Sequence, residues 1–122
     1  MLKQILLVGL GGGVGSILRF LTSTLLFKHN SSFPIGTFVA NILGCLVIGL
    51  FVGLSFRYDF VNKELRHLLI VGFCGGYTTF STFSLENIEL INAGSFGMLA
   101  FYTVASVAIG ILAVWTGIMI VK

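Results

Sequence analysis

Four long apolar runs take up most of the chain and decide what it can fold into. Each is at least as long as the roughly 20 residues that a helix needs to cross a bilayer. Hydrophobic residues make up 57% of the 122 residues and charged residues only 9%, too few to cover a water-soluble surface. The sequence therefore predicts one all-α, multi-pass transmembrane domain, residues 1–122, in the inner cell membrane. The runs are Leu2 to Phe27, Pro34 to Phe56, Leu65 to about Ile91, and Phe96 to Val121.

Short links join these runs, so neighbouring helices are expected to be antiparallel. The links extend from Lys28 to Phe33, from Arg57 to Lys63 and from Asn92 to Ser95. Most Lys and Arg residues lie on the side that holds both termini, which favours cytoplasmic termini. They are scattered at the ends of the runs rather than gathered in a patch, so we expect no nucleic-acid partner.

Glycines and cysteines in the runs are expected to serve packing. In the first run, small residues recur every four positions from Gly9 to Gly13 and from Gly11 to Gly15, a spacing that lets helices approach closely. A dinucleotide-binding loop is excluded because the G-x-G-x-x-G register is not met. The two cysteines stand alone in apolar runs, which indicates core packing rather than a disulfide or a zinc site.

The second run carries a short polar face. Thr37, Asn41 and Gly44 follow at spacings of four and three, which places a hydroxyl, an amide and a gap on one side of a helix. Polar residues inside a membrane must find a partner or line a pathway. Two interpretations of Asn41 therefore stay open, a pathway residue and a hydrogen bond that joins helices.

The fourth run carries a similar stripe, with Tyr102, Ser106 and Gly110 every four residues and Thr103 beside them. Four helices leave little room for a lumen. If these stripes line a pathway, a second subunit is expected to supply the opposite wall. The alternative is that small residues here serve only close helix contact.

The third run is the least regular of the four. A glycine pair, Gly75 and Gly76, is followed by hydroxyl residues in the middle of the run. Adjacent glycines and β-branched threonines are poor helix formers, so a break is expected between Gly75 and Thr79. Broken backbone at that depth is tolerated only where it is buried in protein or lines a wet cavity. It would expose carbonyl oxygens, suited to a hard cation, and amide groups.

Phe80 and Phe83 follow the expected break at helical spacing, interleaved with Ser81 and Ser84. Aromatic rings have a positive edge, so ring edges and hydroxyl groups together can surround an anion that has lost its water. This pattern suggests an anion path. The ordinary alternative is that both rings belong to the apolar core.

Taken together, these segments resemble the Fluc (CrcB) family of fluoride channels over essentially the whole chain. The resemblance rests on the stretch Gly12 to Phe20, on Pro34 to Thr37 with Asn41 and Gly44, and above all on Gly75 to Ser84. It implies an antiparallel, dual-topology homodimer in the lipid bilayer, with two fluoride pores and a central sodium ion. An antiparallel pair conflicts with the excess of Lys and Arg on one side, but the third-run motif is the more specific signal.

The resemblance also implies residue roles. The backbone carbonyls of Gly75 and Thr78 would bind the sodium ion, and Arg19 would lie toward a wide aqueous entrance. Gly110 stands where relatives can carry a track hydroxyl. The fluoride path would be lined by Asn41, Phe80, Ser81, Thr82 and Phe83, with Tyr102 and Ser106 on its polar track.

These expectations define a passive fluoride channel that exports the ion from the cytoplasm. Such a pore must replace the water around fluoride with donors held in place. No Asp, Glu or His is expected in the middle of a span, which argues against proton-coupled transport and against a small multidrug-type transporter. A non-transporting assembly subunit is the other alternative. We expect no enzyme, because no nucleophile with a base or metal set is evident.

Overall fold

The computed structural model describes all 122 residues and contains helices and connecting loops but no strand. Four helical stretches are long and apolar enough to cross a membrane, which confirms the four predicted spans. The third stretch, Lys63–Asn92, is assembled from several shorter helices, whereas each of the others is one helix. In chain order the helices are α1 (Leu2–Leu25), α2 (Ile35–Arg57), α3 (Lys63–Arg66), η1 (His67–Cys74), α4 (Gly75–Tyr77), α5 (Phe80–Asn92) and α6 (Phe96–Val121).

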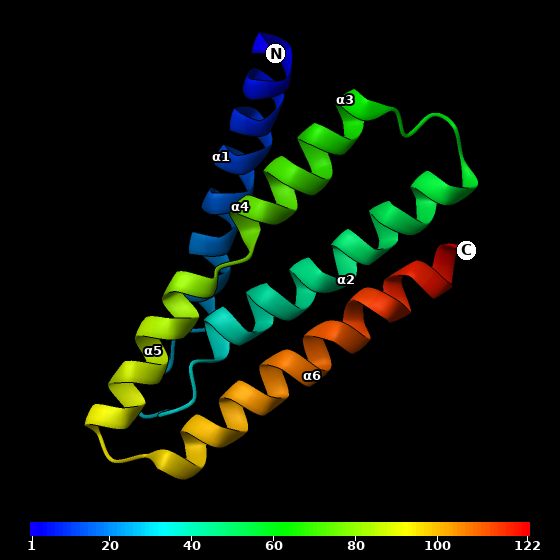
Figure 1. Cartoon of the computed structure of the whole chain (residues 1–122). Helices are drawn as coiled ribbons and strands as arrows, with labels where there is room; N and C mark the ends of the chain where they lie inside the picture. Colours follow the sequence, from blue (N-terminus) through cyan, green and yellow to red (C-terminus); the bar gives the residue numbers. More distant parts are fainter.

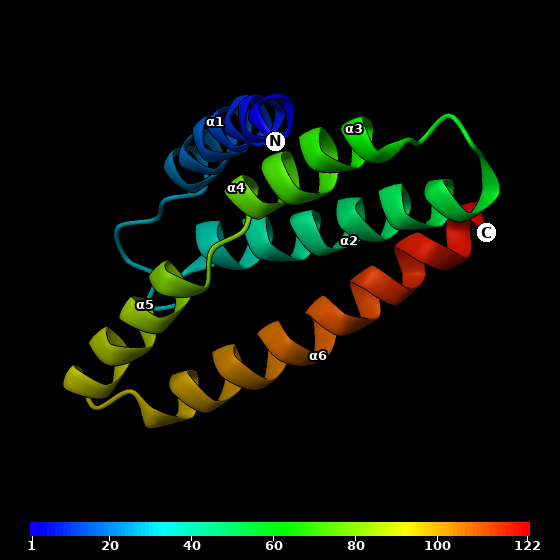
Figure 2. The ribbon, with the colours of Figure 1, turned by 45° about the horizontal axis from the view of Figure 1, so that its top comes forward.

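The helices form two packed pairs. α2 and α6 run parallel and side by side, while α1 packs against the first half of the third stretch (Figures 1 and 2). Both chain termini lie toward the end where α2 finishes and α3 begins. There Lys3 forms an ion pair with Glu64, and the Arg57 side chain donates to the Val121 carbonyl over 3.3 Å. Both termini therefore face the same side of the molecule.

Glycines provide the closest contacts within each pair. A Cβ added at Gly15 of α1 would lie 2.8 Å from the backbone nitrogen of Tyr77, and one at Gly11 equally close to the nitrogen of Phe73. These distances are too short for any side chain, so this spaced pair serves helix packing as predicted. Gly9 and Gly13 have nothing within 4 Å, so the second predicted pair makes no such contact within the chain.

The segment η1 is a π-helix, with hydrogen bonds five residues apart. This form is rare and often occurs near functional sites. Its residues, His67–Cys74, form an apolar run that is equally compatible with an α-helix. Cys74 at its end is only 2% exposed, which confirms a packing position for that thiol. The π-helix itself was not predicted.

Between α4 and α5 the backbone leaves the helical conformation for two residues. Thr78 has φ −90° and ψ 157°, and Thr79 has φ −149° and ψ 122°, both extended values. The glycine pair before them stays helical. A Cβ at Gly76 would approach the Cα of Gly12 to 2.9 Å, so that glycine serves the contact with α1 rather than the extended link. Figure 2 shows the link as a short non-helical segment between α4 and α5, which are offset from each other.

Candidate functional site

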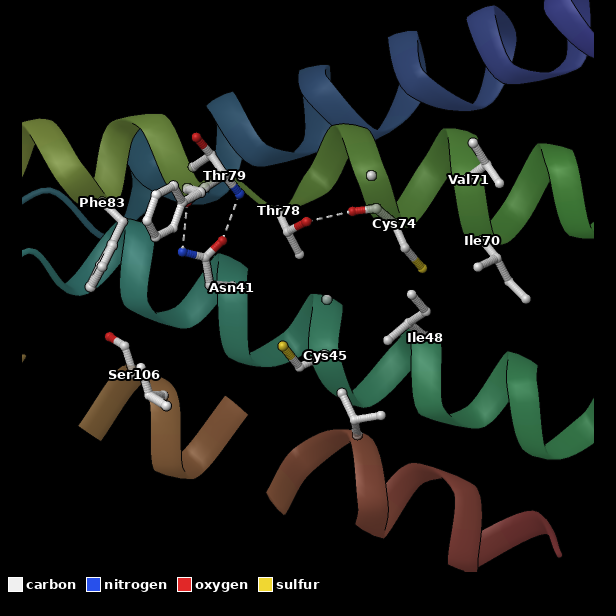
Figure 3. A pocket seen from close by; sticks show the side chains of 15 residues that line it. Asn41, Cys45, Ile48, Ile70, Val71, Cys74, Thr78, Thr79, Phe83 and Ser106 are labelled. Atoms are coloured by element: carbon white, nitrogen blue, oxygen red, sulfur yellow. Dashed lines mark hydrogen bonds between the residues drawn. The ribbon is translucent and has the colours of Figure 1, made fainter. Parts of the chain in front are cut away.

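Asn41 on α2 binds the extended link directly. Its Oδ1 accepts a hydrogen bond from the Thr79 backbone N–H over 2.7 Å, and its Nδ2 donates to the Thr79 carbonyl over 3.0 Å (Figure 3). The amide thus pairs with both polar groups of one residue, as a neighbouring strand would. One hydrogen of Nδ2 remains free. Asn41 therefore holds the link in place and still offers one donor.

Thr79 also begins the next helix. It is the N-cap residue of α5, and its Oγ1 accepts from the backbone N–H of Thr82 over 3.2 Å. A threonine in extended conformation is well suited to this position. The hydroxyls of Ser81 and Thr82 lie 3.2 and 3.3 Å from the same oxygen. The three hydroxyls form one small cluster at the start of α5.

The link leaves backbone carbonyls at the end of α4 without their helical donors. The N–H four residues after Gly75 belongs to Thr79 and is bound to Asn41. The N–H four residues after Thr78 belongs to Thr82 and is bound to Thr79 Oγ1. Uncapped carbonyls at a helix end need another partner. The Gly75 and Thr78 oxygens therefore fit a hard cation such as sodium, which prefers oxygen ligands.

Arg19 supplies the partner for a third carbonyl at this helix end. Its Nε donates to the Gly76 oxygen over 3.1 Å, and the Ser16 hydroxyl lies 3.5 Å from the same atom. The Thr22 hydroxyl lies 3.0 Å from the Tyr77 hydroxyl. A cation near the C-terminal end of a helix is favourable because that end carries partial negative charge. One face of α1 thus fixes the end of α4.

A cavity of about 590 Å³ lies beside the extended link. We call it the Asn41 cavity. Asn41, Phe83 and Ser106 lie toward one end of it and Ile70 and Val71 toward the other (Figure 3). The Ser106 hydroxyl is fully buried and has no hydrogen-bond partner. A buried hydroxyl without a partner is unfavourable unless something that accepts or donates a hydrogen bond comes to it.

Aromatic rings border the same cavity. The rings of Phe80 and Phe83 are 5.8 Å apart between centroids, and the rings of Phe83 and Tyr102 are 5.0 Å apart. Phe83 therefore lies between the other two. Phe80 is 79% exposed although it lines the cavity, so the cavity is open on that side. Within one chain the wall is incomplete.

Glu86 lies at the centre of a second polar group, which we call the Glu86 cluster. Its Oε2 accepts from the Thr37 hydroxyl and its Oε1 from the Tyr102 hydroxyl, each over 2.9 Å. Thr37 is 5% exposed and Tyr102 fully buried. The expectation that no acid lies in the middle of a span gave Glu86 no role in the site. Glu86 is near the end of its run in sequence, but its side chain reaches between α2 and α6.

A family model described as CrcB-like protein, Camphor Resistance (CrcB), matches residues 6–118. The chain belongs to the CrcB family. Relatives named fluoride-specific ion channel FluC occur in Azobacteroides pseudotrichonymphae (46% identical, covering 100% of this chain and 98% of the relative) and Flavobacterium psychrophilum (47%, covering 99% and 98%). One in Methylobacillus flagellatus is 43% identical, covering 98% and 94%. Its family and its four apolar helices make this CrcB chain a multi-pass membrane protein.

Several residues predicted for the CrcB site come together around the Asn41 cavity. Its lining includes Asn41, Gly75, Thr78, Phe80, Phe83 and Ser106. Ser81 and Thr82 are not part of that lining, and their hydroxyls face the Thr79 side chain instead. Tyr102 contacts Phe83 from outside the lining and binds Glu86. Gly110 is buried, and a Cβ there would lie 3.5 Å from the Cys45 sulfur.

Sequence reasoning missed Glu86 as a site residue of this CrcB chain. The signal that could have found it is spacing: Phe83 and Glu86 are three residues apart and so share a helix face. In addition, no group of three or more His, Cys, Asp or Glu side chains is arranged to hold a metal ion.

Proposed function

We propose that the chain is one subunit of a fluoride-selective channel through which fluoride leaves the cytoplasm passively. The observation that carries the proposal is the buried, unpartnered hydroxyl of Ser106 in a cavity bordered by Asn41 and two phenylalanine rings. The family and the names of the relatives support an ion channel rather than an enzyme. An inside-negative membrane potential favours exit of an anion by about 2.3 kcal/mol per 100 mV.

The chemistry of the cavity suits a small, strongly hydrated anion. Fluoride must exchange its water for donors that are already positioned. The free N–H of Asn41 and the Ser106 hydroxyl are such donors, and the ring edges of Phe80 and Phe83 carry partial positive charge. A narrow path of this kind excludes larger halides by size. We assign Ser81, Thr82 and Tyr102 to the approaches of the same path.

The proposal includes a second copy of the chain, which closes the open side of the Asn41 cavity. The Asn41 cavity is open where Phe80, Val71 and Val107 are 79%, 54% and 56% exposed, although all three line it. An apolar cavity wall that ends at an exposed face requires another surface against it. A homodimer of antiparallel subunits would close two such cavities and produce two pores. The remaining exposed apolar surface would face the lipid bilayer.

The end of α4 is the proposed site of a structural sodium ion. The carbonyls of Gly75 and Thr78 would hold it, because their helical donors are bound elsewhere. A bound sodium ion would balance the partial negative charge of these oxygens at the dimer centre. Arg19 carries out the same task for the neighbouring carbonyl of Gly76. We propose that the extended link lies at mid-membrane depth, where only protein or a wet cavity can satisfy it.

Glu86 gives one specific reason to consider a proton-coupled, multidrug-type transporter, since that class needs an acid within the membrane. Both of its oxygens, however, accept hydrogen bonds from hydroxyl groups of the chain. A carboxylate that is bound in this way is not free for a cationic substrate. The fluoride channel therefore remains the preferred function. A transporter of this type would couple efflux to a proton gradient, whereas the channel would not.

The experiment is anion efflux from liposomes that hold the purified protein, with fluoride compared with chloride. We expect fast efflux of fluoride alone, with an unchanged rate constant when a proton gradient of either sign is imposed. Replacement Phe80→Ile should lower fluoride efflux by at least tenfold. The matched control is Phe20→Ile, because Phe20 is also largely exposed but lies on α1, away from the cavity. Efflux of neither anion from well-folded native protein would refute the proposal.

A further inference from the structure

A second cavity, of about 400 Å³, opens at the end of the molecule opposite to both termini. We call it the Lys28 cavity. It lies between the end of α1, the loop to α2, and the end of α5. Its wall combines apolar and polar groups and includes the hydroxyls of Ser23, Ser31, Ser32 and Ser95. The proposed function gives this cavity no role.

The Lys28 cavity ends at the Glu86 cluster. Thr37 and Glu86 both line it, and their side chains are joined by the 2.9 Å hydrogen bond described above. Tyr102 binds the other oxygen of Glu86. An open cavity with several hydroxyl groups in its wall therefore reaches a buried group of hydroxyls and one carboxylate.

The two cavities lie end to end along the helices. On α2, Thr37 lines the Lys28 cavity, and Asn41, one turn further, lines the Asn41 cavity. On α5, Glu86 lines the Lys28 cavity, and Phe83, three residues earlier, lines the Asn41 cavity. One helical turn is about 5.4 Å long. The two cavities are therefore about one helical turn apart on both helices, beside the Glu86 cluster and the Phe83 ring.

We propose that the Lys28 cavity is an aqueous mouth of the ion path, and that fluoride passes between it and the Asn41 cavity at the Glu86 cluster. This inference rests on the proposed function and adds the route by which the ion reaches water on the side opposite to the termini. The mouth is built by a single chain, unlike the Asn41 cavity. Each subunit therefore carries its own.

The mouth contains one cation and two carboxylates, so donors for an anion come from Lys28 and the hydroxyl groups rather than from the net charge of the wall. Lys28 is a cation in the wall, and three hydroxyls, those of Ser23, Ser32 and Ser95, have no protein partner. Glu86 is bound to two hydroxyls, while Glu89 is exposed in the outer wall beside the loop that carries Lys28. Free hydroxyl donors can therefore meet an anion as it regains water. An added negative charge in this wall should oppose the ion more than an added positive charge.

The test uses the full chain with single cysteines placed in the mouth, Ser23→Cys and Ser95→Cys, which come from different parts of the fold. Each variant is labelled in detergent with a methanethiosulfonate reagent that leaves either a sulfonate or a trimethylammonium group. Mass spectrometry gives the extent of labelling, and the protein is then reconstituted for fluoride efflux. The matched control is His29→Cys, an exposed position in the same loop that does not line the cavity. The native chain, treated alike, gives the baseline for Cys45 and Cys74.

We expect the sulfonate adduct at Ser23→Cys or Ser95→Cys to lower fluoride efflux at least tenfold and the trimethylammonium adduct to lower it less. The His29→Cys adducts should stay within twofold of the unlabelled variant. Native efflux rates from fully labelled Ser23→Cys and Ser95→Cys would refute the proposal that the Lys28 cavity is a mouth of the ion path. Equal inhibition at His29→Cys would refute it as well. In either case the unlabelled native chain would still conduct fluoride, so the proposed function would stand. Failure of the unlabelled native chain to conduct would instead overturn the function itself.

Discussion

Asn41 combines two roles that sequence reasoning had left as alternatives. It joins two helices by hydrogen bonds, since both polar groups of Thr79 are bound to its amide. It also lines the cavity and keeps one N–H free. A residue that both orders the backbone and faces the proposed path cannot be exchanged for an isosteric carboxylate without effect on each. One substitution at Asn41 should therefore lower both stability and transport.

Asn41→Asp removes the Nδ2 donor and places a carboxylate oxygen against the Thr79 carbonyl. An unmatched buried acceptor of this kind costs about 1–3 kcal/mol. We expect a lower melting temperature in detergent and at least a tenfold loss of fluoride efflux. The control is Asn92→Asp, an exposed position at the end of α5 for which the same change of charge should leave both measurements near native. Native efflux from folded Asn41→Asp would contradict the assignment.

Ser106→Ala should lower transport without lowering stability. The Ser106 hydroxyl is buried without a partner, so its removal should leave stability unchanged or raise it by up to about 1 kcal/mol. Fluoride efflux should fall, because a donor is lost from the cavity. Melting temperature and efflux are measured on the same preparation. If both fall together, Ser106 has a structural partner and is not a donor for the ion.

At the scale of elements, the spans followed from hydropathy while the details within the third span did not. Apolar length alone predicts four helices, because a bilayer accepts little else. The extended conformation of Thr79 depends on contacts from α2, made by the two hydrogen bonds of Asn41. Such contacts join residues far apart in sequence, so local propensity cannot place them. It could indicate only a weak region from Gly75 to Thr79.

Glu86 illustrates the same limit at the site. Its hydroxyl partners, Thr37 and Tyr102, lie 49 and 16 positions away in sequence. In the sequence, Glu86 lies near the end of an apolar run. Its side chain instead reaches a gap between two other helices. Contacts with two other helices decide this outcome, whereas the spacing from Phe83 indicates only which face of α5 Glu86 shares.

The contact between α1 and α4 gives a prediction with an internal control. Gly15→Ala places a Cβ 2.8 Å from the Tyr77 nitrogen, and backbone cannot move aside as a flexible side chain can. Overpacking of this kind costs about 1–3 kcal/mol. Gly13→Ala, half a turn away, meets nothing within 4 Å and should gain up to about 1 kcal/mol from helix propensity. We expect Gly15→Ala to melt at lower temperature than native and Gly13→Ala at equal or higher temperature.

At the scale of the whole molecule, the structure of one chain has few buried residues and a cavity with one open side. Only 14 of 122 residues are buried, so most apolar side chains require lipid or another protein surface. Val71 on η1 lines the Asn41 cavity and is 54% exposed, whereas Leu6 on α1 is 63% exposed and lies far from that cavity. A second copy would cover the first residue and leave the second in lipid.

This difference allows the proposed dimer to be tested by a bulky residue at each position. Val71→Trp should wedge the two copies apart, so that native mass spectrometry from detergent shows mainly single chains and fluoride efflux is lost. Leu6→Trp should remain paired and conduct, because lipid accommodates the ring where a tightly packed interface cannot. If both variants were dimers, the face that carries the Asn41 cavity would not be part of the dimer interface. The incomplete wall at Phe80 would then require a different partner, so stoichiometry and efflux must be measured on the same sample.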